Sequence, residues 1–199
     1  MINNLNKVRF YRCTQLARKS QRDNFYQNLS MALGTHLHKA LAVKHSQLWP
    51  TRHHEQEQIC LFSYKGYIKS LLGGTPDMFW TEADTLYVVD YKTKKDTSKT
   101  KTQSAWWSQL AIYALLILTN SNEEYNEKEK TWAGIKNISM EIWTYEQKET
   151  IEESILKTED IFSSKATTAD IWEATRKFIK EAVGKDWEIV PFSKARVVL

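Results

Sequence analysis

Residues 73–77 read GGTPD and residues 86–92 read LYVVDYK, and these two stretches decide the fold and the chemistry that the chain can carry. The second stretch has the aliphatic and aromatic composition of a β-strand. Side chains two positions apart on a strand point to the same face, so Asp90 and Lys92 project together. The glycine pair and Pro76 predict a bend, after which a strand, a short turn and a returning strand bring Asp77 beside Asp90.

This arrangement of charges favours a metal site. Two carboxylates a short distance apart repel each other unless a cation lies between them. Mg²⁺ prefers such oxygen ligands and keeps several waters. A lysine next to the ion can position a water and stabilise charge on a phosphoryl group. Asp77, Asp90 and Lys92 therefore predict phosphodiester hydrolysis, with an ordinary hairpin bearing surface charges as the alternative that spacing alone leaves open.

The segments on either side supply helices and further strands. Leucines at positions 29, 33, 37 and 41 predict a helix from about Ser30 to His45, which ends before Trp49-Pro50. Residues 56–64, 67–72, 77–80 and 86–92 follow as four strands, for which we expect an antiparallel meander.

The second half of the chain begins with a basic loop, residues 92–101, that reads KTKKDTSKTK. Lys94 and Lys95 in this loop could steer phosphates, although a solvated face is the alternative. The patterns then predict a strongly apolar helix over residues 103–119, a polar loop over 120–130 and a strand over 138–145. We expect helices over 147–162 and 169–183, the second capped by Thr168 or Asp170, and a tail, 187–199, that adds a short strand or docks on the core.

These motifs resemble those of the PD-(D/E)XK nuclease superfamily. Asp77 followed by Asp90-Tyr91-Lys92 matches the D–(D/E)–x–K pattern, and Pro76 supplies the family's proline. Two further motifs, Gly34-x-x-x-His38 and Gln109-x-x-x-Tyr113, look like those of the RecB-like branch. The resemblance covers residues 34–113 in the family's order and implies an α/β (α+β), restriction-endonuclease-like core with a mixed central β-sheet flanked by helices.

The resemblance also implies roles for individual residues. His38, Asp77 and Asp90 would ligate the metal together with the backbone carbonyl of Tyr91, and Lys92 would orient the attacking water. His36 points nearly half a turn away from His38 and is expected to be exposed. Imidazole ligands suit Mn²⁺ better than Mg²⁺, so we expect Mg²⁺ or Mn²⁺ with Mn²⁺ preferred.

The same resemblance assigns a substrate-facing role to the helix that follows the basic loop. Gln109 and Tyr113 lie one helical turn apart and therefore share a face. In the family this face borders the site and contacts or orients DNA.

Two departures from the family narrow the prediction. Some RecB-like nucleases hold an iron–sulfur cluster with one early and three late cysteines, whereas this chain has only Cys13 and Cys60, so we predict no cluster. The GxxxxGK[ST] loop of helicases is also absent. Unwinding would need a helicase or recombination partner, or a substrate that is single-stranded or has open ends.

Length and composition set the remaining bounds. The 199 residues, with a net charge of +4, suit a single nuclease domain over residues 1–199, with a motif core at about 30–145 and a C-terminal helical segment and tail at 146–199. No apolar run has the length of a membrane span, so we expect a soluble, cytoplasmic protein, of a size that by family analogy suits a virus or mobile element. Residues 8–28 mix basic and aromatic side chains, which suits either a nucleic-acid-facing patch or a solvated helix.

The favoured function is a metal-dependent DNA exonuclease that acts at ends or in single strands. A structure-specific or restriction-like endonuclease uses the same chemistry and ranks lower, because no separate sequence-reading module is evident. A non-catalytic DNA-binding or assembly subunit is a third reading, disfavoured because no ligand of the motif is missing. An RNA-directed nuclease stays open as well.

Overall fold

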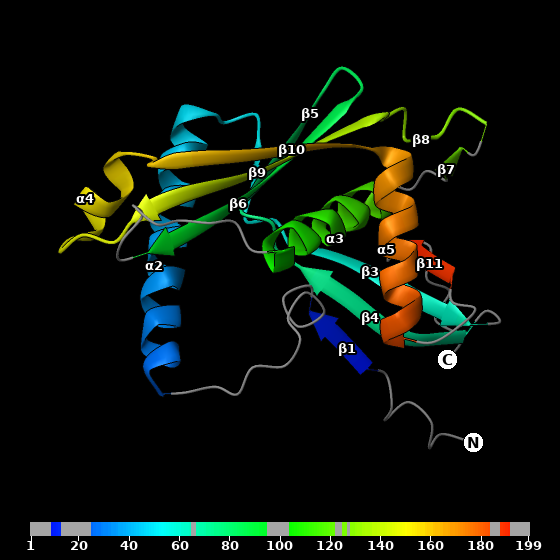
Figure 1. The fold of residues 1–199 in the computed structure, drawn as a ribbon, viewed down its shortest axis with the longest axis horizontal. Coiled ribbons are helices and arrows are strands. Elements are labelled where there is room, and N and C mark those ends of the chain that lie inside the picture. Colours follow the sequence, from blue (N-terminus) through cyan, green and yellow to red (C-terminus); the bar gives the residue numbers. More distant parts are fainter. Residues whose placement is uncertain are drawn as a thin grey trace.

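The computed structural model describes residues 9–12, 25–64, 67–94, 104–121, 125–126, 128–183 and 188–191. Two β-sheets with a helix between them form the centre of the fold (Figure 1). This helix, α3 (Ser104–Asn120), buries its apolar side chains against both layers, which explains why its sequence is hydrophobic on nearly every side.

The central sheet has five strands in the order β10 (Asp160–Thr167), β9 (Asn137–Glu146), β6 (Thr85–Lys94), β5 (Met78–Glu82) and β2 (His53–His54). Strands β6 and β9 run parallel, and the other neighbours are antiparallel, so the sheet is mixed as expected. Strand β6 is in the middle and is buried on both faces, which is why Val88 and Val89 are both apolar.

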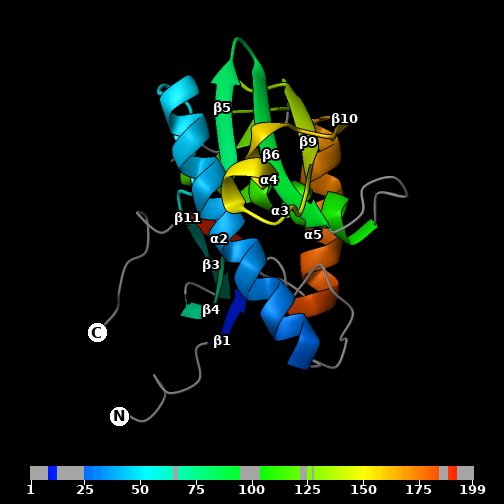
Figure 2. The same ribbon diagram turned by 90° about the vertical axis from the view of Figure 1, so that its left-hand side faces the viewer.

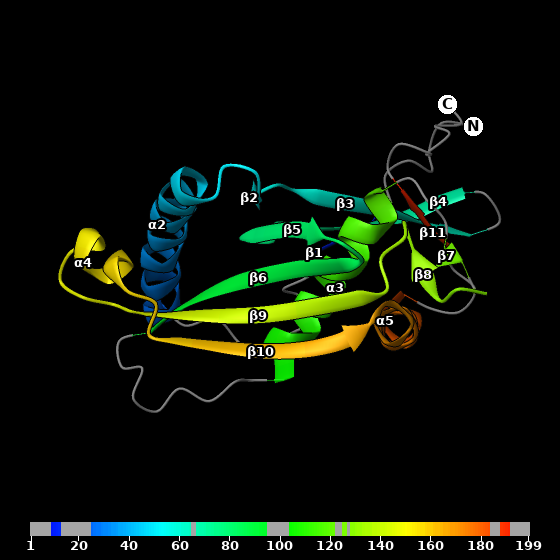
Figure 3. The same cartoon turned by 90° about the horizontal axis from the view of Figure 1, so that it is seen from above.

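Two helices cover opposite faces of this sheet. Val88 packs in the core under α3, whereas Val89 and Tyr91 pack with Leu41 of α2 (Phe25–Leu48) on the other face. Figures 2 and 3 show α2 crossing the sheet near the carboxyl ends of β6 and β9. Helix α2 is longer at both ends than the predicted span of 30–45. The site residues of β6 therefore lie between two helices.

The second sheet has the order β1 (Arg9–Arg12), β4 (Tyr67–Gly74), β3 (Gln58–Tyr64) and β11 (Glu188–Pro191). The predicted four-stranded meander is wrong, because β3–β4 and β5–β6 are hairpins in different sheets. Strand β4 ends at Gly74, and Pro76 has no N–H with which to continue a ladder. Strand β11 confirms that the tail adds a short strand.

The predicted helix over residues 147–162 is also wrong. Helix α4 (Ile151–Leu156) begins after the cap Thr150 and ends where the Lys44 ammonium binds the carbonyls of Ile155 and Leu156. The chain then forms β10, an edge strand paired with β9 along its whole length. The segment 146–199 is thus not only helical, since part of it extends the central sheet.

Helix α5 (Thr168–Val183) follows β10 directly. Its cap is Thr167, whose hydroxyl accepts from the Asp170 N–H while the Asp170 carboxylate accepts from the Thr167 N–H. This is a reciprocal capping arrangement, with the cap one residue before the predicted Thr168. The polar stretch 120–130 contains β7 (Tyr125–Asn126), which pairs with β8 (Thr131–Trp132) directly after the stretch.

Among the helices of the described residues, none is both long enough and apolar enough to cross a membrane. Of the basic and aromatic segment 8–28, positions 8 and 13–24 lie outside the described residues.

Candidate active site

Asp77 is placed by the bend that separates the two sheets. The pairing of β5 with β6 starts at Met78 and Val89, so Asp77 lies one position before the ladder, next to Asp90. Its Oδ2 accepts a hydrogen bond of 2.6 Å from the Tyr91 N–H, and the carboxylate is buried. The Asp77 side chain therefore accepts from the Tyr91 N–H of β6, just past Met78 and Val89, where the β5–β6 ladder begins.

His38 reaches the same place from α2. Its Nδ1 lies 2.9 Å from Asp77 Oδ1, and its side chain keeps 27% of its surface exposed. Burial would lower the pKa of His38, but Asp77 and Asp90 together outweigh this effect and raise the pKa above its ordinary value. The structure thus brings together His38 and Asp77, which are distant in sequence, and leaves His36 exposed as predicted.

Asp90 and Lys92 form an ion pair on the face of β6 that looks toward α3. The Asp90 side chain is 4% exposed and that of Lys92 is 20% exposed, so the pair opens to solvent only on the lysine side. Burial raises the pKa of the Asp90 carboxyl, Asp77 adds to this, and Lys92 opposes it. The sequence prediction that both side chains project together is confirmed.

Gln109 and Tyr113 of α3 lie against this pair from the other side. The Gln109 amide donates to Tyr113 Oη at 2.7 Å and to Asp90 Oδ1 at 3.4 Å, and both side chains are buried. The expected common face of the helix is therefore real. Gln109 reaches the acidic strand itself, which the sequence did not indicate.

The predicted phosphate-steering lysines are only partly described. Lys94 is half-buried at the end of β6, and its ammonium lies 4.7 Å from the centre of the Trp106 ring. Lys95 lies outside the described residues. The motifs gave no role to Trp106, although its position three residues before Gln109 places it on the same side of α3.

Sequence reasoning also missed His45, which lies two helical turns after His38. Its Nδ1 is 2.6 Å from Tyr91 Oη, and its Nε2 is 3.4 Å from Tyr145 Oη. Burial lowers the pKa of His45 to about 4, so this imidazole is neutral. His45 thereby connects α2 to β6 and β9 on the face opposite to Asp90 and Lys92.

The donor set suits a hard divalent cation. Asp90 Oδ2 is buried, and apart from the Lys92 ammonium no hydrogen-bond donor of normal geometry reaches it among the described residues. Asp77 is close enough to Asp90 to disfavour the charge of the Asp90 carboxylate, which a cation between them would relieve. His38 uses Nδ1 toward Asp77, so Nε2 is the nitrogen not used in that contact.

The carboxylates nevertheless are held by the protein's own groups. Within the described part of the chain, no three His, Cys, Asp or Glu side chains converge tightly enough to define an ion site. His38 and the Tyr91 N–H occupy Asp77, while Lys92 and Gln109 occupy Asp90. Metal binding would therefore exchange at least one of these protein contacts for a metal ligand.

Comparison with known proteins finds a matching family model and solved structures that are similar to this chain. The model of the PD-(D/E)XK nuclease superfamily matches residues 13–196. The solved structure of SSO0001 is similar with a TM-score of 0.47 and 14% identity, covering 89% of this chain and 80% of that one. An alkaline exonuclease from Laribacter hongkongensis is similar with a TM-score of 0.31 and 10% identity, covering 88% of this chain and 89% of that one. No curated protein matches the sequence.

A mixed sheet flanked by helices is consistent with the fold of the PD-(D/E)XK nucleases, and its central strand carries the Asp90–Lys92 ion pair. Since the superfamily model spans nearly all of the chain, this protein belongs to the PD-(D/E)XK nuclease superfamily. It is accordingly a nuclease, of a superfamily whose members generally use divalent metals and act on DNA.

Proposed function

We propose that this protein is a metal-dependent DNA exonuclease that hydrolyses phosphodiester bonds at ends or in single strands. The observation that carries the proposal is that Asp77, on a bend, lies near the Asp90–Lys92 ion pair of the central strand. His38 joins them from α2, and Gln109 joins them from α3. Four separate segments thus supply the groups that phosphoryl transfer requires.

The proposed ion would be held by His38, Asp77, Asp90 and the backbone carbonyl of Tyr91. A divalent ion there supplies Lewis acidity toward a phosphoryl oxygen and makes water a better nucleophile at neutral pH. Manganese suits this mixture of imidazole and carboxylate better than magnesium does.

The side chains of the protein have separate tasks in this proposal. Lys92 orients the attacking water and stabilises negative charge on the phosphoryl group, since its ammonium pairs with Asp90 and its side chain keeps 20% of its surface exposed. Gln109 fixes the carboxylate of Asp90 from the helix side. Lys94, and Lys95 beyond the described residues, attract the phosphates of the incoming strand.

The preference for ends rests on the Gln109 and Tyr113 pair, which resembles an element associated in the family with end-processing enzymes. Gln109 touches both Asp90 and Tyr113, so any strand that contacts this face of α3 lies next to the acidic pair. An endonuclease would use the same groups, and topology of the substrate separates the two.

The test uses linear single- and double-stranded DNA labelled at the 5′ or the 3′ end, and covalently closed circular DNA labelled internally, each with Mn²⁺. An exonuclease shortens the linear substrates from one labelled end and leaves the circles intact. Nicking or linearisation of the circles would show that the protein is an endonuclease and not a strict exonuclease. An intact set of all substrates would contradict the proposed activity on DNA.

A further inference from the structure

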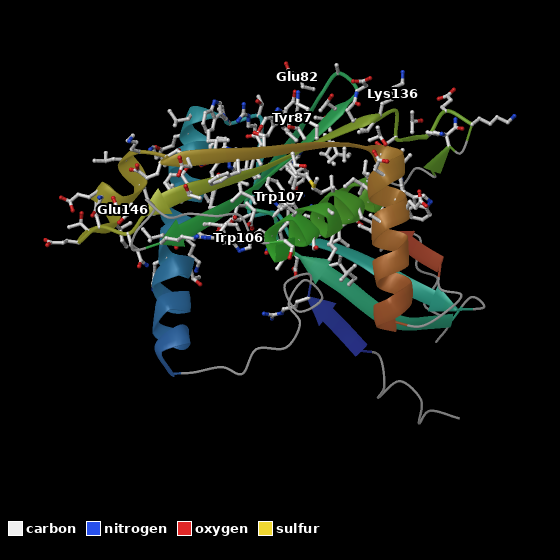
Figure 4. The ribbon with its side chains drawn as sticks, viewed as in Figure 1. Glu82, Tyr87, Trp106, Trp107, Lys136 and Glu146 are labelled. Atoms are coloured by element: carbon white, nitrogen blue, oxygen red, sulfur yellow. The ribbon has the colours of Figure 1, made fainter. Side chains whose placement is uncertain are left out.

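Trp106 stands at the amino-terminal end of α3 (Figure 4), where it is half-buried. The Nζ of Lys94 lies 4.7 Å from the centre of the indole ring, and the Nζ of Lys92 lies 5.8 Å from it. The Trp106 side chain also packs against the hydrophobic core that contains Val88 and Leu110. The site residues therefore extend beyond Gln109 to an aromatic ring.

Two rows of side chains face each other at this place. Asp90, Lys92 and Lys94 alternate along β6 and share the face toward α3. Trp106, Gln109 and Tyr113 are spaced three and four residues apart and share one side of α3. Gln109 lies against Asp90 and Trp106 lies against the two lysines, so the indole continues the site toward the end of β6.

The Trp106 indole and the Lys94 ammonium together fit the base and the phosphate of one nucleotide. An ammonium over an indole is held loosely, and a phosphate is a stronger partner for it because the hydrogen bonds are charge-assisted. An indole, in turn, stacks on any nucleobase whose face is uncovered, whatever its identity. Inside a duplex both faces of a base are covered by its neighbours, so only an unpaired or terminal base can use the ring.

We propose that Trp106 is a stacking platform for an unpaired base close to the scissile phosphate, while Lys94 binds a phosphate of the same stretch of strand. This inference rests on the proposed function and narrows its substrate to single-stranded or frayed DNA. Trp106 is thereby a specificity-determining residue, since its contribution is realised on unpaired nucleotides alone.

The experiment tests whether the Trp106 indole acts on one particular base of the substrate. An end-labelled single strand is prepared with one abasic nucleotide, moved position by position through the region near the cleaved bond. Cleavage with Mn²⁺ gives KM and kcat for the wild type, Trp106→Leu and Trp106→Phe. Trp80→Leu is the matched control, because Trp80 also contacts a cation, Arg52 at 3.7 Å, but packs on the α2 side of the sheet.

The proposal predicts one position at which loss of the base raises KM for the wild type about tenfold, from the usual strength of aromatic stacking. Trp106→Leu shows the raised KM on intact single strands and no further loss at the abasic position. Trp106→Phe stays near the wild type, and Trp80→Leu keeps the wild-type response. A blunt duplex responds little to any of these changes.

Equal sensitivity of the wild type and Trp106→Leu at every abasic position would overturn the inference. A loss of kcat by Trp106→Leu that is the same on all substrates would also overturn it, since that is the mark of a structural role. Should Trp106→Leu not fold, the abasic series of the wild type still decides, because the absence of any position at which loss of the base raises its KM would overturn the inference.

The proposed function and this inference can fail separately. Binding of the same labelled strands, measured by fluorescence anisotropy with Ca²⁺, does not depend on cleavage. If the wild type binds DNA more weakly at one abasic position but cuts nothing, the stacking proposal stands and the nuclease proposal is wrong. If the wild type cuts DNA and responds to the loss of no single base, the nuclease proposal stands and the stacking proposal is wrong.

Discussion

Asp77 accepts a hydrogen bond of 2.6 Å from the backbone N–H of Tyr91, so the bend before β5 is bound directly to the strand that carries Asp90 and Lys92. The same carboxylate contacts His38 through its other oxygen. One side chain thus joins α2, the bend and β6, and the alignment of the site depends on it.

Replacing Asp77 by Asn tests the charge of this junction while conserving its size. We expect a loss of nuclease activity of about 100-fold or more, because stabilisation by a bound metal amounts to several kcal/mol in such reactions. Rates on labelled DNA with saturating Mn²⁺ provide the measurement. Asp84→Asn, the same change in the β5–β6 turn, should keep the wild-type rate, and an equal loss there would speak against a specific role of Asp77.

Gln109→Met tests the support that α3 gives to Asp90. Groups that orient metal ligands typically contribute about 10- to 100-fold to metal affinity or activity, and we expect a loss in that range. The measurement is the Mn²⁺ concentration at half-maximal rate. Tyr113→Phe, which removes an acceptor of Gln109 but keeps its contact with Asp90, should cost less. A larger loss for Tyr113→Phe would place the important contact at the tyrosine instead.

Metal selectivity follows from the mixture of imidazole and carboxylate ligands. We expect faster cleavage with Mn²⁺ than with Mg²⁺, and His38→Ala should reduce that preference. Calcium, which does not normally support this chemistry, should inhibit. Cleavage rates in each metal after chelation and reloading supply the data, and Ca²⁺ activity equal to that with Mn²⁺ would refute the site.

The buried His45 predicts a specific dependence of stability on pH. Its pKa of about 4 in the folded protein is below the ordinary 6.5, so the unfolded chain binds the proton first as the pH falls. Stability contributed by neutral His45 is therefore present above pH 6.5 and is lost between 6.5 and about 4, by about 3 kcal/mol in all.

Urea unfolding at several pH values checks this sign. His45→Gln cannot titrate, so the difference in stability between the wild type and this variant should change in favour of the variant as the pH falls below 6.5. A difference that stays constant from pH 7 to pH 4 would mean that His45 is protonated with its ordinary pKa.

Local patterns in the sequence predicted much of the core. The alternation around Asp90 and the apolar positions from Leu110 to Leu118 are set by neighbours in sequence, and β6 and α3 form where expected. Strand β10 was missed because its pairing with β9, rather than its own composition, determines its conformation. The meander failed for the same kind of reason, since a hairpin pattern does not say which sheet it joins.

In the site, too, some features follow from local sequence and others from tertiary packing. Spacing predicted that Asp90 and Lys92 share a face, and the resemblance selected His38 over His36. The contacts of Gln109 with Asp90 and of Trp106 with Lys94 arise only when α3 docks on β6, a tertiary relationship that no local pattern contains. His45 was missed because its partners, Tyr91 and Tyr145, come from two other strands.

We propose that Asp90 and Lys92 form the hydrolytic centre of this nuclease. The most direct measurement is the rate of Mn²⁺-dependent hydrolysis of end-labelled linear DNA by the wild type, Asp90→Ala and Lys92→Ala, with binding of the same DNA measured in parallel. Our expectation is that both variants bind DNA and that neither cuts it. Cleavage by both variants at the wild-type rate would contradict it.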